Sequence, residues 1–376
     1  MLDALHCYLK YFAVLGLVPW SEKRPQQRLQ KIYTTAIMSI NIGIAFYKVV
    51  YSPIKGDLPV SMLVSSIVYI SQILTMSVIE LQVMCQYERY YEFCLQLKTL
   101  NRLFQSELLQ PIQGLPRARY IKFIALGILN IVSLFPGIYV VLHYDYIGYY
   151  WYSLGAILIN RFQCLLLLLN AELLGYHVEL LGLRLLAVLN CRQMSLHSVL
   201  DVKCEQMCSL EYLLSLKRAY MELYRLFGQF NGLYGWSIVS IFVVMFLDSM
   251  INIYWTLLIL AKIYSFVFNY MTSSTYIPLL ILLFTFCRCG EYCKRQHIMM
   301  GSYVRGLACT SQRQPELPEL TSQAYNAVLA EFVLQVEQDV LSISAEGFMN
   351  IDYSLLMSIF TAMVTYLIVL MQFSSL

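Results

Sequence analysis

Seven long apolar stretches alternate with charged segments along this chain. They cover roughly 32–53, 58–83, 123–144, 149–172, 236–260, 264–287 and 353–374. Each holds about the 20 residues that a helix needs to cross a bilayer core of ~30 Å. Arg161 and Asp248 interrupt the fourth and fifth stretches near their middle. The pattern predicts an all-α, polytopic membrane protein with seven transmembrane helices.

The last stretch carries a polar stripe. Ser354, Ser358, Thr361, Thr365 and Gln372 recur at steps of four, three, four and seven, which places them along one side of a helix. Such a stripe faces either neighbouring helices, where hydroxyls serve as packing contacts, or a path for water. The pattern by itself leaves both readings open.

The connections after the second, fourth and sixth stretches are long and charged. Leucines at helical spacing continue the fourth stretch beyond residue 172 and resume before the fifth, so we expect both helices to project beyond the membrane. Residues 301–320 contain Gly301, Gly306, Pro315 and Pro318 and are expected to form a loop.

A short charged helix is expected between this loop and the last stretch. Thr321 or Ser322 is its expected N-cap. Its apolar stripe comprises Tyr325, Val328, Leu329, Phe332, Val336 and Val340. We expect this stripe to pack against the projecting helices as an anchor, with Gly347 marking the break before the last span.

Composition and charge agree with a membrane protein and give its orientation. At 59% hydrophobic and 13% charged residues, the chain is not a soluble globular protein. Of its 26 Lys and Arg residues, 22 fall before the first stretch or in the connections 2–3, 4–5 and 6–7. The positive-inside rule therefore predicts a cytosolic N-terminus and an extracellular C-terminus.

This orientation divides the chain into four parts. They are a cytosolic N-terminus (1–31), six transmembrane helices with their cytosolic extensions (32–287), a cytosolic loop and anchor helix (288–352), and the last transmembrane helix (353–376).

Aromatic and polar residues gather in the predicted outer halves of the helices. The candidate ligand-binding residues are Tyr139, Tyr150, Trp151, Arg161, Asp248, Asn252, Trp255 and Tyr276. An interfacial aromatic belt is the alternative reading for the tyrosines, but a belt does not explain Asp248. We expect Arg161 to pair with Asp248, either as a structural ion pair or within a pocket for a small organic ligand.

Two further carboxylates, Glu80 and Glu172, lie near the inner ends of the second and fourth spans. We expect each to face the cytosolic interface, or a Lys or Arg there.

The end of the chain resembles a known family. Thr365-Tyr366, five apolar residues and Gln372-Phe373 look like the signature of insect gustatory receptors, and residues 344–352 are similar to that family's lead-in to its final helix. The resemblance implies a tetrameric, ligand-gated nonselective cation channel, homomeric or formed with related receptors, whose last helices line the pore. The pore and gate candidates are Thr361, Thr365, Tyr366, Ile368, Gln372 and Phe373, with the Gln-Phe pair at the extracellular gate.

The same resemblance implies the setting and the ligand class. It places the protein in the plasma membrane of sensory dendrites, with lipid around it and a small organic tastant as ligand. Leu367 stands where the family's sugar receptors often carry Glu, which favours a ligand other than sugar.

The sequence argues against three other function classes. The predicted orientation is opposite to that of a G-protein-coupled receptor, and no inverted repeat supports a transporter. An enzyme is disfavoured because the sequence has no HExxH motif, intramembrane His cluster or Gly-rich phosphate loop. Cys287, Cys289 and Cys293 lack the spacing of a zinc site, and we expect the cysteines to be structural, reduced or palmitoylated. No metal, other cofactor or nucleic-acid partner is expected.

Overall fold

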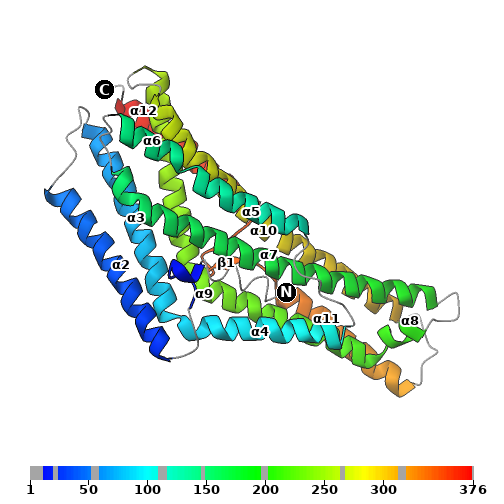
Figure 1. The fold of residues 1–376 in the computed structure, drawn as a ribbon. Helices are drawn as coiled ribbons and strands as arrows, with labels where there is room; N and C mark the ends of the chain where they lie inside the picture. Colours follow the sequence, from blue (N-terminus) through cyan, green and yellow to red (C-terminus); the bar gives the residue numbers. More distant parts are fainter. Residues whose placement is uncertain are drawn as a thin grey trace.

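The computed structural model describes residues 12–19, 24–51, 59–108, 117–144, 149–195, 202–262, 267–311 and 319–374. These residues form a bundle of long helices with one short hairpin (Figure 1). The helices are α2 (Arg24–Tyr51), α3 (Pro59–Cys85), α4 (Tyr87–Ser106), α5 (Arg117–Val132), α6 (Phe135–His143), α7 (Tyr150–Ser195), α8 (Val202–Met207), α9 (Leu210–Leu260), α10 (Val267–Ser311), α11 (Glu319–Gln338) and α12 (Tyr353–Ser374). The hairpin pairs β1 (Ser344–Ala345) with β2 (Met349–Asn350) in antiparallel register. The predicted all-α membrane fold is confirmed.

The apolar helices match the predicted spans. Among the described residues, six helical segments are long and apolar enough to cross a membrane, and α12 adds a shorter apolar helix counted over Tyr353–Val369. Helices α7, α9 and α10 have 46, 51 and 45 residues, so at 1.5 Å per residue each is about 70 Å long, more than twice the bilayer core. The predicted extensions of the fourth and fifth helices are therefore present.

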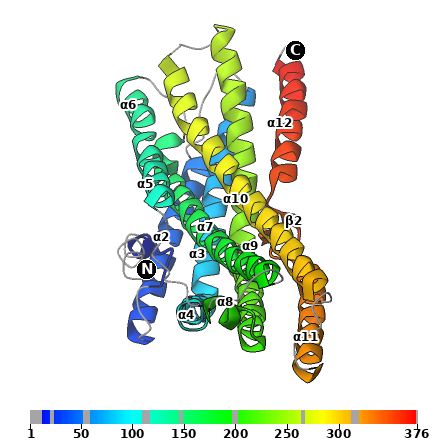
Figure 2. The ribbon, with the colours of Figure 1, turned by 90° about the vertical axis from the view of Figure 1, so that its right-hand side faces the viewer.

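Helix α7 is the centre of the bundle. It contacts α2, α3, α5, α6, α8, α9 and α10 (Figure 2). Its polar residues Asn160, Arg161, Gln163, Asn170 and His177 are all buried. Because each buried polar group needs a partner, the contacts of α7 determine where polar chemistry occurs in this molecule.

The expected loop over 301–320 is wrong for its first half. Helix α10 continues to Ser311, with Gly301 and Gly306 inside it, and Pro315 and Pro318 lie outside the described residues. A Cβ on Gly306 would lie 3.3 Å from the Leu189 side chain of α7. The glycine therefore serves close helix packing here, and tertiary contact outweighs its low helix propensity.

The third span is interrupted. It consists of α5 and α6, separated at Ser133 and Leu134, with Pro136 in the first turn of α6. Proline lacks an N–H and is tolerated in the first turn of a helix. Helix α4, which the apolar pattern does not indicate, turns away from α3 at Gln86 and lies along α9 (Figure 1).

The anchor helix α11 is present and packs against α9 and α10 as expected. Tyr325, Leu329, Phe332 and Val336 are buried, but Val340 is exposed because α11 ends at Gln338. Thr321 and Ser322 lie inside the helix, which begins at Glu319, so the expected N-cap is wrong.

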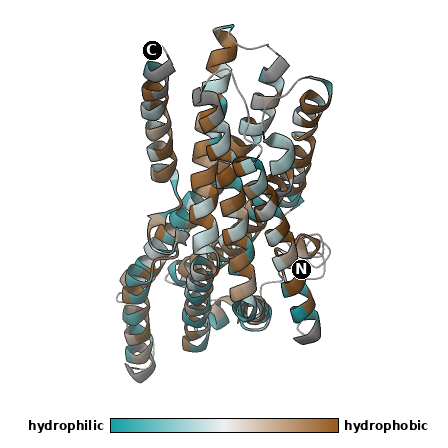
Figure 3. Cartoon of the chain, turned by 90° about the vertical axis from the view of Figure 1, so that its left-hand side faces the viewer, coloured by the Kyte–Doolittle hydropathy of each residue, from teal (hydrophilic) through white to brown (hydrophobic). Residues whose placement is uncertain are grey.

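Residues 339–352, which we call the elbow, join α11 to α12. Gly347 has a φ of 74°, a conformation that suits glycine, and the chain turns there as predicted. Figure 3 shows apolar colour concentrated along the half of the bundle that contains α12, while hydrophilic residues are more frequent around the elbow and α11.

Candidate functional site

Helix α12 presents its polar stripe away from the rest of the subunit. Ser354, Ser358, Thr361, Thr365 and Gln372 are all exposed. At about 100° per residue, they fall within about 60° of one another around the helix axis. The stripe is therefore not buried against the helices that the structure describes.

The opposite side of α12 attaches it to the bundle. Leu356 and Met363 are 7% and 2% exposed and lie roughly 180° from the stripe. Helix α12 packs mainly against α9 and α10 (Figure 2). An apolar face fixed to the subunit thus leaves a polar face for lipid, for water or for another subunit.

The hydroxyl groups of the stripe bond to the helix that carries them. Ser358, Thr361 and Thr365 each donate to the carbonyl four residues earlier, at 2.9 Å. This bond gives each hydroxyl proton an acceptor within the membrane-spanning helix. The hydroxyl oxygen can still accept a hydrogen bond from water.

The remaining pore candidates lie at different angles around α12. Ile368 is exposed at the edge of the stripe. Tyr366 lies on the flank, with its ring centroid 6.0 Å from that of Phe246 on α9. The side chain of Phe373 is outside the described residues, so its expected place at the gate stays a prediction.

The elbow fixes the start of α12. Asp352 accepts a hydrogen bond from the N–H of Leu355 at 3.1 Å, the geometry of an N-cap. On the α9 side, Asn231 donates to the carbonyl of Ser342 and accepts from the N–H of Ser344, both at 3.0 Å. The segment that leads into α12 is thereby held to α9.

Arg161 is buried, 3% exposed, on α7. Its guanidinium donates to the carbonyl of Asn130 at 3.0 Å, to the hydroxyl of Ser133 at 2.7 Å and to the carbonyl of Thr275 at 3.3 Å. Asn130 lies in the last turn of α5, where carbonyls lack a partner within the helix, and Ser133 lies at the break between α5 and α6. The interruption of the third span thus supplies the acceptors for a buried arginine.

Asp248 makes a separate set of contacts from α9. Its carboxylate accepts from Asn252 at 2.8 Å and from Gln72 at 3.5 Å. Thr275 donates to the Asn252 amide oxygen at 2.9 Å, and Asn160 donates to the Gln72 amide oxygen at 2.6 Å. Helices α3, α7, α9 and α10 therefore meet in one buried polar cluster.

The expected direct ion pair between Arg161 and Asp248 is wrong. No ion pair of the described residues joins the two side chains; instead both line one cavity of ≈ 10 Å³, together with Gln72 and Asn160. That is roughly the room of a single water molecule. The Asn160 amide oxygen and Arg161 Nε, both buried here, have no hydrogen-bond partner among the residues that the structure describes.

The aromatic candidates do not form one site. Tyr150 is buried and donates to the carbonyl of Leu134 at 3.3 Å. Tyr139 and Trp151 are exposed, and Tyr139 stacks on His143 with ring centroids 4.3 Å apart. Trp255 and Tyr276 are half-buried. Exposed tyrosine and tryptophan suit the aromatic belt reading, whereas Tyr150 is a packing residue.

Sequence reasoning missed several members of the polar cluster: Gln72, Asn130, Ser133, Asn160 and Thr275. Polar residues deep inside the second, third, fourth and sixth apolar stretches were the available signal. Their mutual contacts bridge up to 176 residues of chain, which no local pattern encodes.

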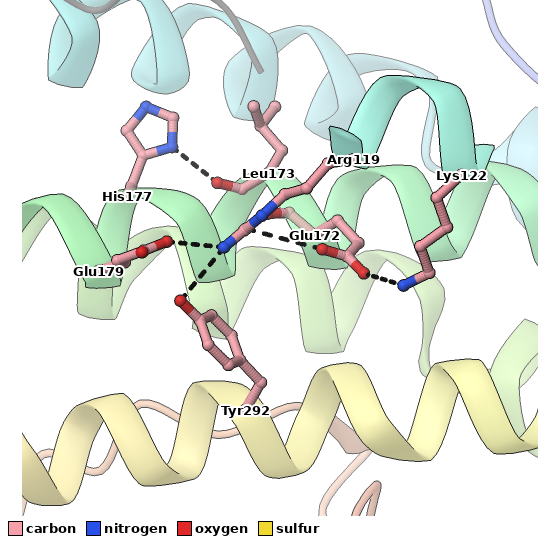
Figure 4. A network of polar contacts seen from close by, with 7 residues as sticks. All are labelled: Arg119, Lys122, Glu172, Leu173, His177, Glu179 and Tyr292. Carbon is pink, nitrogen blue, oxygen red and sulfur yellow. Dashed lines mark hydrogen bonds and ion pairs between the residues drawn. The ribbon is translucent and has the colours of Figure 1, made fainter. Parts of the chain in front are cut away.

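A second polar cluster joins α5, α7 and α10 (Figure 4). Arg119 donates to Glu179 at 2.6 Å and to the Tyr292 hydroxyl at 3.1 Å, and it lies 3.6 Å from a carboxylate oxygen of Glu172. Lys122 pairs with the same Glu172 at 2.7 Å. The expectation of a Lys or Arg near Glu172 is confirmed.

Glu80, for which the same position near the cytosolic interface or a Lys or Arg was expected, is different. It is 1% exposed, and none of the ion pairs among the described residues includes it. Cys287, Cys289 and Cys293 are buried in α10, and the described residues hold no group of three or more metal-binding side chains.

The bundle thus combines apolar, membrane-length helices, a last helix with an exposed polar stripe, and a buried polar cluster. The family profile described as "7tm Chemosensory receptor" matches residues 5–376. The chain belongs to this family of chemosensory receptors, which makes it a multi-pass membrane chemoreceptor and not an enzyme.

Two curated relatives come from Drosophila melanogaster. "Putative gustatory receptor 39b" is 48% identical over 376 residues, covering 100% of both chains. "Gustatory receptor 23a" is 29% identical over 168 residues, which are 42% of this chain and 40% of that one.

Solved structures of the olfactory receptor OR5 from Machilis hrabei share the fold. The complex with eugenol superposes with a TM-score of 0.60 at 15% identity, covering 98% of this chain and 99% of the other. The structure described without eugenol gives a TM-score of 0.61 at 14% identity, with the same coverage.

Proposed function

We propose that this chemoreceptor is a gustatory, ligand-gated, nonselective cation channel in which the last helix of each of four subunits lines the pore. The observation that carries the proposal is the polar stripe of α12, which faces away from its own subunit. Hydroxyls and an amide in lipid are unfavourable relative to water. Assembly of four such faces around a common axis would give them a hydrated path, as a homotetramer or with related receptors.

The stripe itself predicts weak selectivity, because it carries no charged residue. The acidic residues of α11 and the elbow could favour cations at the inner end of such a pore, but three of them form ion pairs. Glu331 pairs with Lys217 at 2.6 Å, Glu337 with Arg305 at 3.2 Å and Asp352 with Lys294 at 3.0 Å. A modest preference for cations over anions is the expected outcome.

Cysteine accessibility tests the pore assignment. Thr361→Cys and Thr365→Cys lie on the stripe, while Val364→Cys lies on an exposed flank at the same depth. A charged, water-soluble thiol reagent applied during ligand-evoked current should alter the current of the first two variants and leave Val364→Cys and the unsubstituted receptor unchanged. Equal sensitivity of all three positions, or of none, would contradict a pore along this face.

The buried polar cluster is the proposed centre of ligand binding. It lies among four helices, and the related olfactory receptor of the same fold has been solved with eugenol. The cavity of ≈ 10 Å³ is far below the ~300 Å³ of a small ligand pocket. A small organic tastant must therefore open this region, and that opening is a natural source of coupling to α12 through α9 and α10.

Current recording from cells that lack other chemoreceptors, exposed to a ligand panel, tests this function directly. Ligand-evoked current from the chain alone would establish a homomeric channel. Current only after coexpression of a related receptor would establish a heteromeric one. Responses that require a G protein and occur without receptor current would contradict the channel proposal.

The proposed orientation has the N-terminus in the cytosol and the C-terminus outside, in the plasma membrane of sensory dendrites. An epitope tag after Leu376 should stain on intact cells. A tag at Gln312, which lies outside the described residues, should stain only after permeabilisation. The reverse staining pattern would exclude this orientation.

A further inference from the structure

Two cysteines from different helices are in direct contact near the C-terminal end of α7, where α8 packs against it. The Sγ atoms of Cys191, on α7, and Cys204, on α8, lie 2.6 Å apart. Both residues are free thiols, brought together where α8 packs on α7. The helices therefore already hold the two side chains in position for a covalent bond between them.

The two thiols differ in their access to solvent. Cys191 is 7% exposed, whereas Cys204 is half-buried. A small oxidant can therefore reach Cys204 first, with Cys191 directly behind it. Among the described residues, the thiols of Cys289 and Cys293 are also in contact, but both residues are buried.

The surroundings tie this pair to the anchor region. Arg192, next to Cys191, stacks over the Tyr325 ring of α11 at 4.0 Å and donates to Ser311 of α10 at 3.3 Å. Arg192 also contacts the thiol of Cys208, one turn beyond Cys204. The cysteine pair therefore lies beside the contact of α7 with α10 and α11.

We propose that Cys191 and Cys204 are a reversible redox site that forms a disulfide when a peroxide reaches α8. The thiolate of Cys204 attacks a peroxide oxygen, the O–O bond breaks, and the leaving hydroxide takes up a proton to become water. Cys204 is then a sulfenic acid. Cys191 attacks its sulfur, the S–O bond breaks, and the S–S bond forms with release of a second water molecule.

Over the two steps together, two thiols are oxidised to one disulfide and one hydrogen peroxide molecule is reduced to two water molecules. A cellular thiol such as glutathione reverses the reaction by exchange, so the pair is reduced at rest if this region faces the cytosol. The bond would fasten α8 to the end of α7, beside the contact of Arg192 with α11. This site is independent of the proposed channel function.

The sequence allows a direct chemical test. Trypsin cleaves after Arg184, Arg192, Lys203 and Lys217, so Cys191 lies in peptide 185–192 and Cys204 in peptide 204–217. The full-length receptor, purified in detergent, is treated with hydrogen peroxide, alkylated, digested without reductant and analysed by mass spectrometry. The expected product is a disulfide-linked pair of these two peptides, which dithiothreitol removes.

Matched variants identify the sulfur atoms. Cys208→Ser should retain the linked pair, because Cys208 shares peptide 204–217 but is not the partner. Cys204→Ser should abolish the pair, and Cys309→Ser, at an exposed lone thiol, should leave it unchanged. The proposal is overturned if the peptides stay unlinked while the exposed Cys309 is oxidised. It is also overturned if the link persists in Cys204→Ser and disappears in Cys208→Ser.

Discussion

Lys294 Nζ lies 3.0 Å from Oδ2 of Asp352, so the sixth membrane helix is bonded to the residue that caps the last one. The other carboxylate oxygen of Asp352 accepts from the Leu355 N–H. One side chain therefore both starts α12 and attaches its base to α10. A Cβ on Gly290, one turn before Lys294, would collide with the carbonyl of Ile351, which shows how closely the elbow approaches α10.

Asp352→Ala should destabilise the receptor by about 1–2 kcal/mol near neutral pH. The N-cap contributes most of this, while the bond to the half-exposed Lys294 is worth less because solvent screens it. Burial acts to raise the pKa of Asp352, but the hydrogen bonds from Lys294 and the Leu355 N–H outweigh it and hold the pKa below its ordinary 3.8.

The direction of this pKa shift fixes the pH dependence. A carboxyl with a lowered pKa contributes its stabilisation above the ordinary value and loses it as pH falls through the folded-state value. Thermal unfolding of the unsubstituted receptor and of Asp352→Ala should therefore differ near neutral pH, and the difference should shrink as the pH falls below 3.8 and through the lowered pKa of Asp352. Arg295→Ala, at an exposed pair on the same helix, should show neither effect. A difference that persists in acid would exclude the charged carboxylate as its cause.

Arg119→Ala should destabilise the junction of α5, α7 and α10 by about 1–3 kcal/mol, because it leaves Glu179 and Tyr292 without a charged donor. Arg119→Lys should recover only part of the loss, since an ammonium group cannot reproduce the planar fork. Thermal unfolding and surface expression measure both variants. Arg117→Ala, at an exposed arginine on the same helix, is the control and should stay within about 0.5 kcal/mol. Equal losses at both positions would indicate a general effect of charge on α5.

The sequence predicted the spans and the stripe of α12 because both are local patterns of hydrophobicity, repeated over many residues. It could not predict the partners of Arg161. These acceptors become available only where α5 breaks from α6, and the Thr275 carbonyl lies 114 residues away in the chain. The continuation of α10 through Gly301 and Gly306 was missed for a related reason. Contact with α7 stabilises α10 at these glycines, and intrinsic helix propensity does not include such tertiary contacts.

Arg161→Leu and Asp248→Leu should each reduce surface expression and ligand response. Each variant removes one of the two opposite charges that line the same buried cavity. Their interaction is indirect, across the shared cavity. We therefore expect a coupling of about 1–3 kcal/mol in a double-variant cycle, less than the 3–5 kcal/mol typical of breaking a directly bonded buried pair. Thermal unfolding of the two single variants and the double variant measures it.

The matched control for this cycle is Arg161→Leu combined with Lys294→Leu, which are on different helices with no bond between them among the described residues. That pair should be additive. A double Arg161 and Asp248 variant that is also additive would show that the two charges do not sense one another.

The gate assignment gives the last prediction. If four copies of α12 line a pore, the path narrows near the end of the helix, where Gln372 follows the hydroxyls of the stripe and Phe373 adds an aromatic ring. Phe373→Ala should raise the basal current, since it removes an apolar constriction that excludes water without adding charge. Gln372→Ala should change ion permeation, because it removes the amide that can solvate a passing ion.

Val364→Ala, on the exposed flank of the same helix, should alter neither property. Current at matched surface expression is the measurement. If Phe373 instead anchors the helix at the membrane interface, its variant should show lower surface expression with unchanged current per channel, and the gate assignment would then be wrong.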